Sequence, residues 1–228
     1  MDNPKSTRGR KRKGARSMAE FEQAQVEELL YQALETEQGG IRIYQQAVGA
    51  AIDRSLKEEW TGYLEQTRNH EKVLLELFAE LGLDPNMQTV GRRLVFQIGS
   101  ALEGAIRRAR EAGDPSSAQV TAAECVTLAE TKDHLNWELI GMLGTKTSGK
   151  QAAALRRASE QVEDEEDRHL YHTAGWTREL WIRSLGLPAV LPPPEEVKHV
   201  ETAIGASRAQ QARESLLGNG RTSQRRTG

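Results

Sequence analysis

Apolar side chains recur along this chain in steps of three and four residues, the spacing that places them on one face of an α-helix. The first such series, between residues 19 and 51, consists of Val26, Leu30, Ala33, Glu37, Gly40, Tyr44, Ala47 and Ala51. The second series follows a turn near residues 53–55 and consists of Trp60, Leu64, Thr67, Glu71, Leu74, Phe78 and Leu81. Gly82 and Pro85 come next and predict the end of the second helix.

Two further long helices are predicted in the second half of the chain. Residues 117–144 carry Val120, Ala123, Thr127, Glu130, His134, Trp137 and Gly141 in register. Residues 150–185 carry Leu155, Ala158, Val162, Glu166, His169, Thr173, Trp176 and Leu180. A shorter helical segment, residues 89–112, joins the two pairs as a crossover. Because no stretch alternates like a strand, we expect an all-α fold, an antiparallel four-helix bundle with a crossover helix.

Basic residues concentrate at both ends of the chain. The first end contains Lys5, Arg8, Arg10, Lys11, Arg12, Lys13 and Arg16, and the second contains Arg221, Arg225 and Arg226. The body between them carries a formal charge of about −11. We therefore predict a disordered basic arm at 1–18, the bundle over 19–187, a Pro-rich linker with an extra C-terminal helix over 188–217, and a disordered basic tail at 218–228.

Composition limits the chemistry available to the chain. With 228 residues, of which 37% are hydrophobic, the chain suits one helical domain with appendages. It contains no apolar run of the roughly 20 residues needed to span a bilayer and no secretory signal, so we expect a cytoplasmic location. Cys125 is the only cysteine, which excludes an internal disulfide and a thiolate metal cluster. Any metal ligands must therefore be oxygen and nitrogen atoms.

The middle of the predicted seam is polar in every long helix. The polar residues at or beside it are Glu37, His70, Glu71, Glu130, His134, Glu166 and His169. Counted from the predicted turns, the four glutamates lie within roughly 3–5 Å of one level along the bundle axis. An unpaired carboxylate in a bundle core costs several kcal/mol, so such charges survive when paired or bound to metal. Carboxylates and imidazoles around two positions are the ligand set of di-iron and di-manganese carboxylate bundles, and we predict two Fe or Mn ions here.

Two motifs resemble the ferritin-like superfamily. Glu37 followed by Tyr44 resembles the first helix of ferritins and bacterioferritins, and the sequence from Glu166 to His169 resembles the ExxH motif of bacterioferritins and rubrerythrins. Segments 63–70 and 160–166 are most similar to a bacterial ferritin-like group of unassigned function that is induced under stress. The resemblance covers about residues 20–186. It implies a four-helix bundle, a homodimer or larger assembly, and a dimetal centre that acts on oxygen, peroxide or ferrous iron.

The second helix departs from the pattern of the superfamily. An acid is expected three residues before His70, but Thr67 stands there. We predict that Glu71, one turn later on the same seam, replaces the missing acid, while Glu65 lies off the seam. His134 is an additional imidazole that could compensate.

Other interpretations remain open at this stage. Glu37, Glu130 and Glu166 could form salt bridges with Arg42, Lys132 and Arg168, in which case the bundle would be a metal-free structural or stress protein. His172 is expected at the surface, Tyr44 and Cys125 in the core, and Trp181 in the core or a dimer interface. Residues 5–16 could also bind nucleic acid weakly and without sequence specificity.

Overall fold

The computed structural model describes residues 19–224, and every regular element in that range is a helix. The first two long helices are confirmed as α1, Ala19–Ala50, and α2, Arg54–Leu81. Gly82 ends α2 in the left-handed region, with φ at 71°, where glycine has no Cβ to clash. The predicted arm at 1–18 lies outside the described residues.

The crossover and the third long helix are also confirmed. The crossover is α3, Val90–Glu111, and the side chain of Thr89 caps it by accepting a hydrogen bond from the backbone N–H of Arg92. The third long helix is α4, Pro115–Lys146, which is capped by the carboxylate of Asp114. Proline at the first helical position lacks only an N–H that would have had no partner there, so the sequence specifies this start twice.

The helix predicted over 150–185 is instead two helices, α5, Lys150–Ser159, and α6, Glu163–Ser184. Between them the N–H of Val162 bonds to the carbonyl of Ser159, a turn tighter than the α-helix. The acidic run from Glu163 to Glu166 forms the first turn of α6, where the positive end of the helix dipole stabilises carboxylates. The sequence pattern predicts a continuous helix through this run. The charge of the run instead favours a new helix start.

The C-terminal helix predicted within 188–217 is also divided. Its parts are α7, Pro194–Val197, and α8, Ala203–Gln224. Helix α8 therefore continues into the segment 218–228 that we expected to be a disordered tail, of which residues 225–228 lie outside the described range. No described helix is long and apolar enough to span a membrane.

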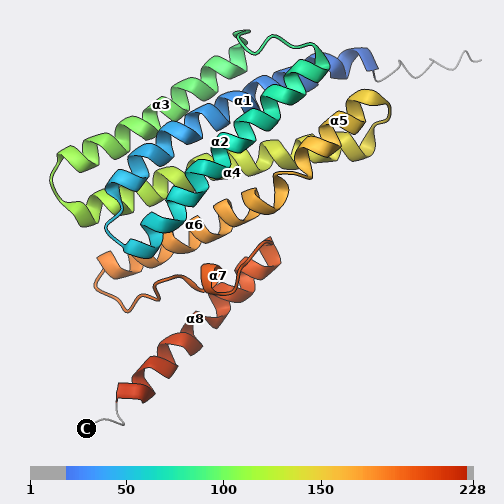
Figure 1. Ribbon diagram of the computed structural model, residues 1–228. Coiled ribbons are helices and arrows are strands. Elements are labelled where there is room, and N and C mark those ends of the chain that lie inside the picture. The colour runs from blue at the N-terminus through green and yellow to red at the C-terminus, as the bar shows by residue number, and fades with distance from the viewer. Residues whose placement is uncertain (1–18, 225–228) are drawn as a thin grey trace, which may run out of the picture.

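Helix α1 lies at the centre of the helical body, packed against α2, α3 and α4, while α4 also packs against α5 and α6 (Figure 1). The C-terminal helices α7 and α8 contact α6. The apolar core is divided into two clusters. One lies around Tyr44, Trp60 and Trp176, and the other around Leu34, Phe78 and Trp137.

The polar seam residues fall between these two apolar clusters on every long helix. On α1, Glu37 stands between Leu34 of one cluster and Ile43 of the other; on α2, His70 stands between Leu64 and Leu74. The two clusters therefore enclose a polar layer. Cys125 is buried as predicted. Trp181 is not in the core, because 42% of it is exposed and its ring N–H donates to Glu124; its place in a dimer interface stays a prediction.

Candidate metal centre

Six acidic and imidazole side chains meet in the polar layer. They come from α1, α2, α4 and α6, and they are Glu37, His70, Glu130, Asp133, Glu166 and His169. None is more than 3% exposed. Six ionisable groups with no access to bulk water require partners for their charges.

Helix geometry explains how two helices each supply two of these groups. Glu130 and Asp133 are three residues apart on α4, and Glu166 and His169 are three residues apart on α6. Residues at i and i+3 lie on one face of a helix, so each pair points into the layer together. The start of α6 at Glu163 sets the phase that turns Glu166 inward.

Glu166 is at the centre of the group. Its Oε1 atom lies 2.9 Å from Nδ1 of His70 and 3.4 Å from Nδ1 of His169. Nδ1 of His70 is also 3.8 Å from Oε1 of Glu37, and Nδ1 of His169 is 3.6 Å from Oε2 of Glu130. Each imidazole therefore turns Nδ1 towards the carboxylates.

The outer nitrogen of each imidazole is bound to a group at the edge of the layer. Nε2 of His70 lies 2.8 Å from Oε2 of Glu165, and Nε2 of His169 lies 2.9 Å from Oε1 of Gln66. An oxygen acceptor at Nε2 holds the proton there and leaves the lone pair of a neutral ring on Nδ1. Both rings are thus oriented as metal-binding histidines are.

Several buried atoms facing the layer have no hydrogen-bond partner. They are Oε2 of Glu37, Oε2 of Glu130, Oδ1 of Asp133 and Oε2 of Glu166, whereas Oε1 of Glu166 and Nδ1 of His70 and of His169 face one another. The other oxygen of Glu37 accepts a hydrogen bond of 2.6 Å from the indole N–H of Trp137. Buried polar atoms are rarely left unsatisfied, so this concentration of unsatisfied atoms makes the layer a candidate site for a cation.

In the protein alone, several ionisable groups of the layer have pKa values shifted from their ordinary ones. Burial and the charges of Asp133 and Glu166 raise the pKa of Glu37 well above its usual value, and burial and Glu166 do the same to Asp133. Burial opposes the charge of Glu166, but His169 and His70 outweigh it and lower its pKa to about 2. Burial alone would lower the pKa of His169, but Glu130 and Glu166 raise it to about 9. In the protein alone, protons bound to these carboxyl and imidazole groups therefore supply the positive charge that balances the layer.

Two triads within the layer have the spacing of metal ligands. His70, Glu166 and His169 form one, and Glu37, Asp133 and Glu166 form the other. In each triad one ligand atom per residue lies within 4.8 Å of the others. Glu166 belongs to both triads, so its carboxylate is the group that two ions would share.

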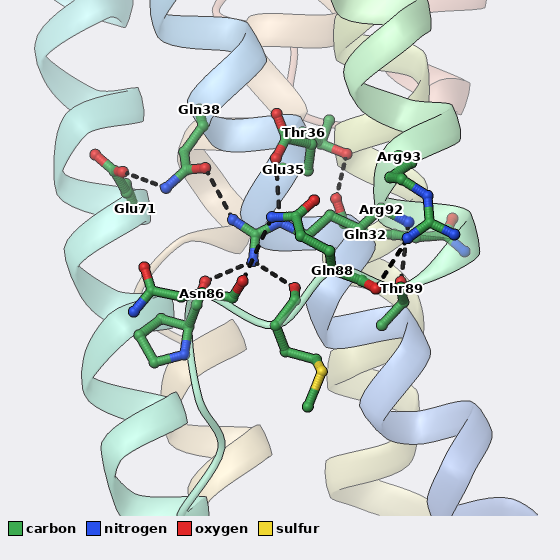
Figure 2. Close-up of polar contacts among 12 residues, drawn as sticks. Gln32, Glu35, Thr36, Gln38, Glu71, Asn86, Gln88, Thr89, Arg92 and Arg93 are labelled. Atoms are coloured by element: carbon green, nitrogen blue, oxygen red, sulfur yellow. Dashed lines mark hydrogen bonds and ion pairs between the residues drawn. The ribbon is translucent and has the colours of Figure 1, made fainter.

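Glu71, predicted as a ligand, lies outside this layer. It is partly buried, and its Oε1 atom accepts a hydrogen bond of 3.0 Å from Gln38. Figure 2 shows that Gln38 in turn accepts from Arg92, a buried guanidinium that also binds Glu35. Glu71 therefore belongs to the polar network that attaches the start of α3 to α1. His70 and Glu71 are consecutive residues of α2 and point in different directions around the helix axis. Only the histidine side chain therefore lies in the polar layer.

His134, the other additional candidate, also lies apart from the triads. Its Nδ1 atom is 3.4 Å from Oδ1 of Asp167, and the imidazole is 23% exposed. Thr67 is buried on the seam, but its hydroxyl donates to the carbonyl of Tyr63 and faces its own helix. Glu65 is exposed, as predicted.

His172 was expected at the surface but is buried beside the polar layer. Its Nδ1 atom lies 2.9 Å from Oε1 of Glu59 and 3.1 Å from the hydroxyl of Tyr63. The indole N–H of Trp176 donates to both Glu59 and Glu196 of α7, at 2.7 and 2.6 Å. Burial and the charge of Glu59 raise the pKa of Glu196 to about 7. This second cluster attaches the C-terminal segment to the helical body.

The salt bridges considered as an alternative are formed by other residues. Arg42 pairs with Glu35 and Glu103, and Lys132 donates to Asn136. Arg168 lies 4.0 Å from Glu201. The three inward glutamates are left without these cations.

Asp133 is the one member of the layer that the sequence reasoning missed. The signal was available, because an acid three residues after Glu130 repeats the i, i+3 spacing of Glu166 and His169. We considered only His134 at this turn, since imidazole is the expected partner. No protein-family model, curated protein or solved structure matches this chain at a significant level, so the interpretation of the site rests on its geometry.

Proposed function

We propose that this protein binds two iron or manganese ions in the polar layer and uses them in a reaction with oxygen, peroxide or ferrous iron. The observation that carries the proposal is Glu166, a buried carboxylate that belongs to both triads and whose Oε2 atom has no hydrogen-bond partner. A buried anion in that position is stabilised best by cations on both of its sides.

The charges of the layer support two divalent ions. Four carboxylates supply a formal charge of −4, and two divalent cations supply +4. They are Glu37, Glu130, Asp133 and Glu166. With His70 and His169 neutral, the layer would then be electrically balanced, and the carboxyl groups would no longer need protons.

The donor atoms also fit these metals. His70 and His169 would hold one ion with Glu166, while Glu37 and Asp133 would hold the other with the same bridging glutamate. Glu130 lies beside His169 and can bind the first ion. Carboxylate and imidazole donors suit iron and manganese, whose change of oxidation state supplies the redox chemistry.

The residues around the layer would control that reaction. The indole N–H of Trp137 holds Glu37 by one oxygen and leaves the other for an ion. Glu165 and Gln66 fix the rings of His70 and His169, as outer hydrogen bonds do in metal sites. The two apolar clusters flank the layer, so its carboxylates would hold the ions in a low-dielectric environment.

This arrangement also supports a ferritin-like architecture for α1, α2, α4 and the α5–α6 pair. In dimetal carboxylate bundles, all the long helices contribute ligands to a metal layer halfway along the bundle. The proposal includes assembly into a homodimer or larger homo-oligomer and a role in stress protection. The predicted binding of nucleic acid by residues 5–16 lies outside the described residues and stays a separate prediction.

Metal analysis of the full chain, purified without chelator and then reconstituted anaerobically with Fe²⁺ or Mn²⁺, tests the proposal. We expect about two ions per chain, and Glu166→Ala should reduce this to less than one because both ions lose a ligand. Glu65→Ala removes an exposed glutamate and should leave two. If the wild-type protein binds no metal after reconstitution, the layer is a proton-sharing network in a metal-free bundle. If Glu166→Ala retains two ions, the metals do not depend on the shared glutamate and the proposed ligand set is wrong.

A further inference from the structure

A surface cavity of about 240 Å³ leads to the metal layer from the side of α4 and α6. Its lining residues come from α4, from α6 and from the segment that leads into α8: His134, Trp137, Glu138, Glu163, Glu166, Asp167, Tyr171, Glu201, Thr202 and Ala203. At about 30 Å³ per water molecule it has room for roughly eight waters. It is therefore large enough for a hydrated ion.

The inner end of the cavity is formed by residues of the candidate centre. Trp137, which holds Glu37, and Glu166, the shared carboxylate, both line it although each is only 1% exposed. Oε1 of Glu166 faces His70 and His169 at 2.9 and 3.4 Å, whereas Oε2 lacks a hydrogen-bond partner. A buried carboxylate with one unpartnered oxygen thus faces a water-sized space that opens at the surface.

The walls of the cavity carry negative charge. Glu138, Glu163, Asp167 and Glu201 line it, and none of the lining residues is a lysine or arginine. Arg168 lies 4.0 Å from Glu201 and offsets part of this charge from outside the lining. His134, 3.4 Å from Asp167, adds a nitrogen donor. Acidic walls around a narrow opening raise the local concentration of cations.

We propose that this cavity, which we call the vestibule, is a weak outer site for a hydrated divalent cation and the route by which the ion reaches Glu166. The inference rests on the proposed function and extends it. Glu201, Thr202 and Ala203 of the C-terminal segment complete the wall of the vestibule, so that segment takes part in loading the centre. His134 and Asp167 hold the incoming ion near the entrance while it exchanges water for protein oxygens.

Rapid mixing of the full-length, metal-free protein with CoCl₂ tests this inference, because ligand-field absorption of Co²⁺ follows its arrival in a site of nitrogen and oxygen donors. The test variant is Glu138→Gln with Glu201→Gln, two exposed acids on different sides of the vestibule. The matched control is Glu65→Gln with Glu80→Gln, which changes the net charge equally on α2. A third variant, Thr202→Trp, fills the entrance without changing charge.

We expect the test variant and Thr202→Trp to load about 3- to 10-fold more slowly than the control at low salt, with the same final stoichiometry. The advantage of the wild-type protein over the charge variant should shrink at 0.5 M NaCl, where steering is screened. Equal loading rates in all variants, with normal final stoichiometry, would overturn the proposal that the ion enters through the vestibule. The proposed metal centre would not be affected by that result. A wild-type protein that never binds Co²⁺, Fe²⁺ or Mn²⁺ would instead overturn the proposed function.

Discussion

Oε1 of Gln66 on α2 lies 2.9 Å from Nε2 of His169 on α6. The bond is made on the outer side of the ring, and the inner nitrogen faces Glu130 and Glu166 at 3.6 and 3.4 Å. An amide oxygen accepts a hydrogen bond without taking the proton, so Gln66 keeps a proton on Nε2 and leaves the lone pair on Nδ1 whenever the ring is neutral. Gln66 would therefore position a metal ligand without touching the metal.

Replacing Gln66 by leucine tests that role, since leucine keeps the approximate size but cannot accept the proton. We expect metal affinity to fall about 10- to 100-fold, the usual effect of losing an outer hydrogen bond. Chelator competition measures the affinity, and Gln161→Leu, at an exposed position between α5 and α6, is the control. Equal affinities in the two variants would show that another contact orients His169.

The network in Figure 2 predicts a large stability effect at Arg92. Its guanidinium binds Glu35 at 3.1 Å, Gln38 at 3.2 Å and the backbone carbonyls of Pro85 and Met87, all at a buried position. Arg92→Met should destabilise the fold by about 3 kcal/mol, because it leaves a buried carboxylate partly unpaired. Urea unfolding measures the change.

Two further variants separate charge from packing at this position. Arg93→Met removes a neighbouring exposed arginine and should cost less than about 1 kcal/mol. Adding Glu35→Gln to Arg92→Met should recover part of the lost stability, because the buried negative charge of Glu35 is then removed. A double variant less stable than Arg92→Met would show that Glu35 is held mainly by Arg42, which lies 3.4 Å away.

The carboxyl of Glu196 predicts a pH dependence of stability. Burial and the nearby charge of Glu59 raise its folded pKa to about 7, against 4.5 for an ordinary glutamate. The unfolded chain therefore loses this proton first, so stability falls as pH rises from about 4.5 to 7 and then levels. Glu196→Gln cannot ionise and should not show this loss.

Thermal unfolding at pH 5 and pH 8 measures the effect. At each pH, the midpoint of wild type is subtracted from the midpoint of Glu196→Gln. This difference should be about 2–4 °C larger at pH 8 than at pH 5, which is the shift that roughly 1 kcal/mol gives in a chain of this size. This figure allows for solvent screening of a partly exposed carboxyl. Glu65→Gln should show no such difference between the two pH values. A constant offset for Glu196→Gln would contradict the raised pKa.

The sequence predicted the helices well where apolar spacing and end signals agreed. Gly82 marked the end of α2, which the structure confirms, because glycine adopts the left-handed conformation that ends a helix. The division between α5 and α6 was missed, since Val162 keeps the apolar register through the break. Periodicity reports which face is buried and is insensitive to a short tight turn.

The candidate centre was predicted in outline, but its membership was only partly right. Glu37, His70, Glu130, Glu166 and His169 lie together because each continues an apolar seam or stands beside it. The same reasoning could not separate Glu71 from His70, which differ by about 100° around α2. Nor could it foresee that Gln38 would hold Glu71 outside the layer, because that contact depends on Arg92 of α3.

Comparison of Asp133 with Glu71 decides whether the missing acid of α2 is replaced from α4 or from α2 itself. Asp133 is buried, belongs to a ligand triad and has an unpartnered oxygen. Glu71 is partly buried and bound to Gln38. Asp133→Asn keeps the size of the side chain but lowers its ability to bind a cation, and it removes one charge from the balance of four carboxylates.

We therefore expect Asp133→Asn to lower the metal content from about two ions per chain to about one, because the triad of Glu37, Asp133 and Glu166 loses a ligand while the histidine triad keeps all three. Glu71→Gln should retain two ions, since a glutamine at this position still accepts the hydrogen bond from Gln38. Metal analysis after equilibration with a weak chelator measures both variants, and circular dichroism confirms that each is folded. If Glu71→Gln loses an ion and Asp133→Asn does not, α2 moves on metal binding and supplies its own acid after all.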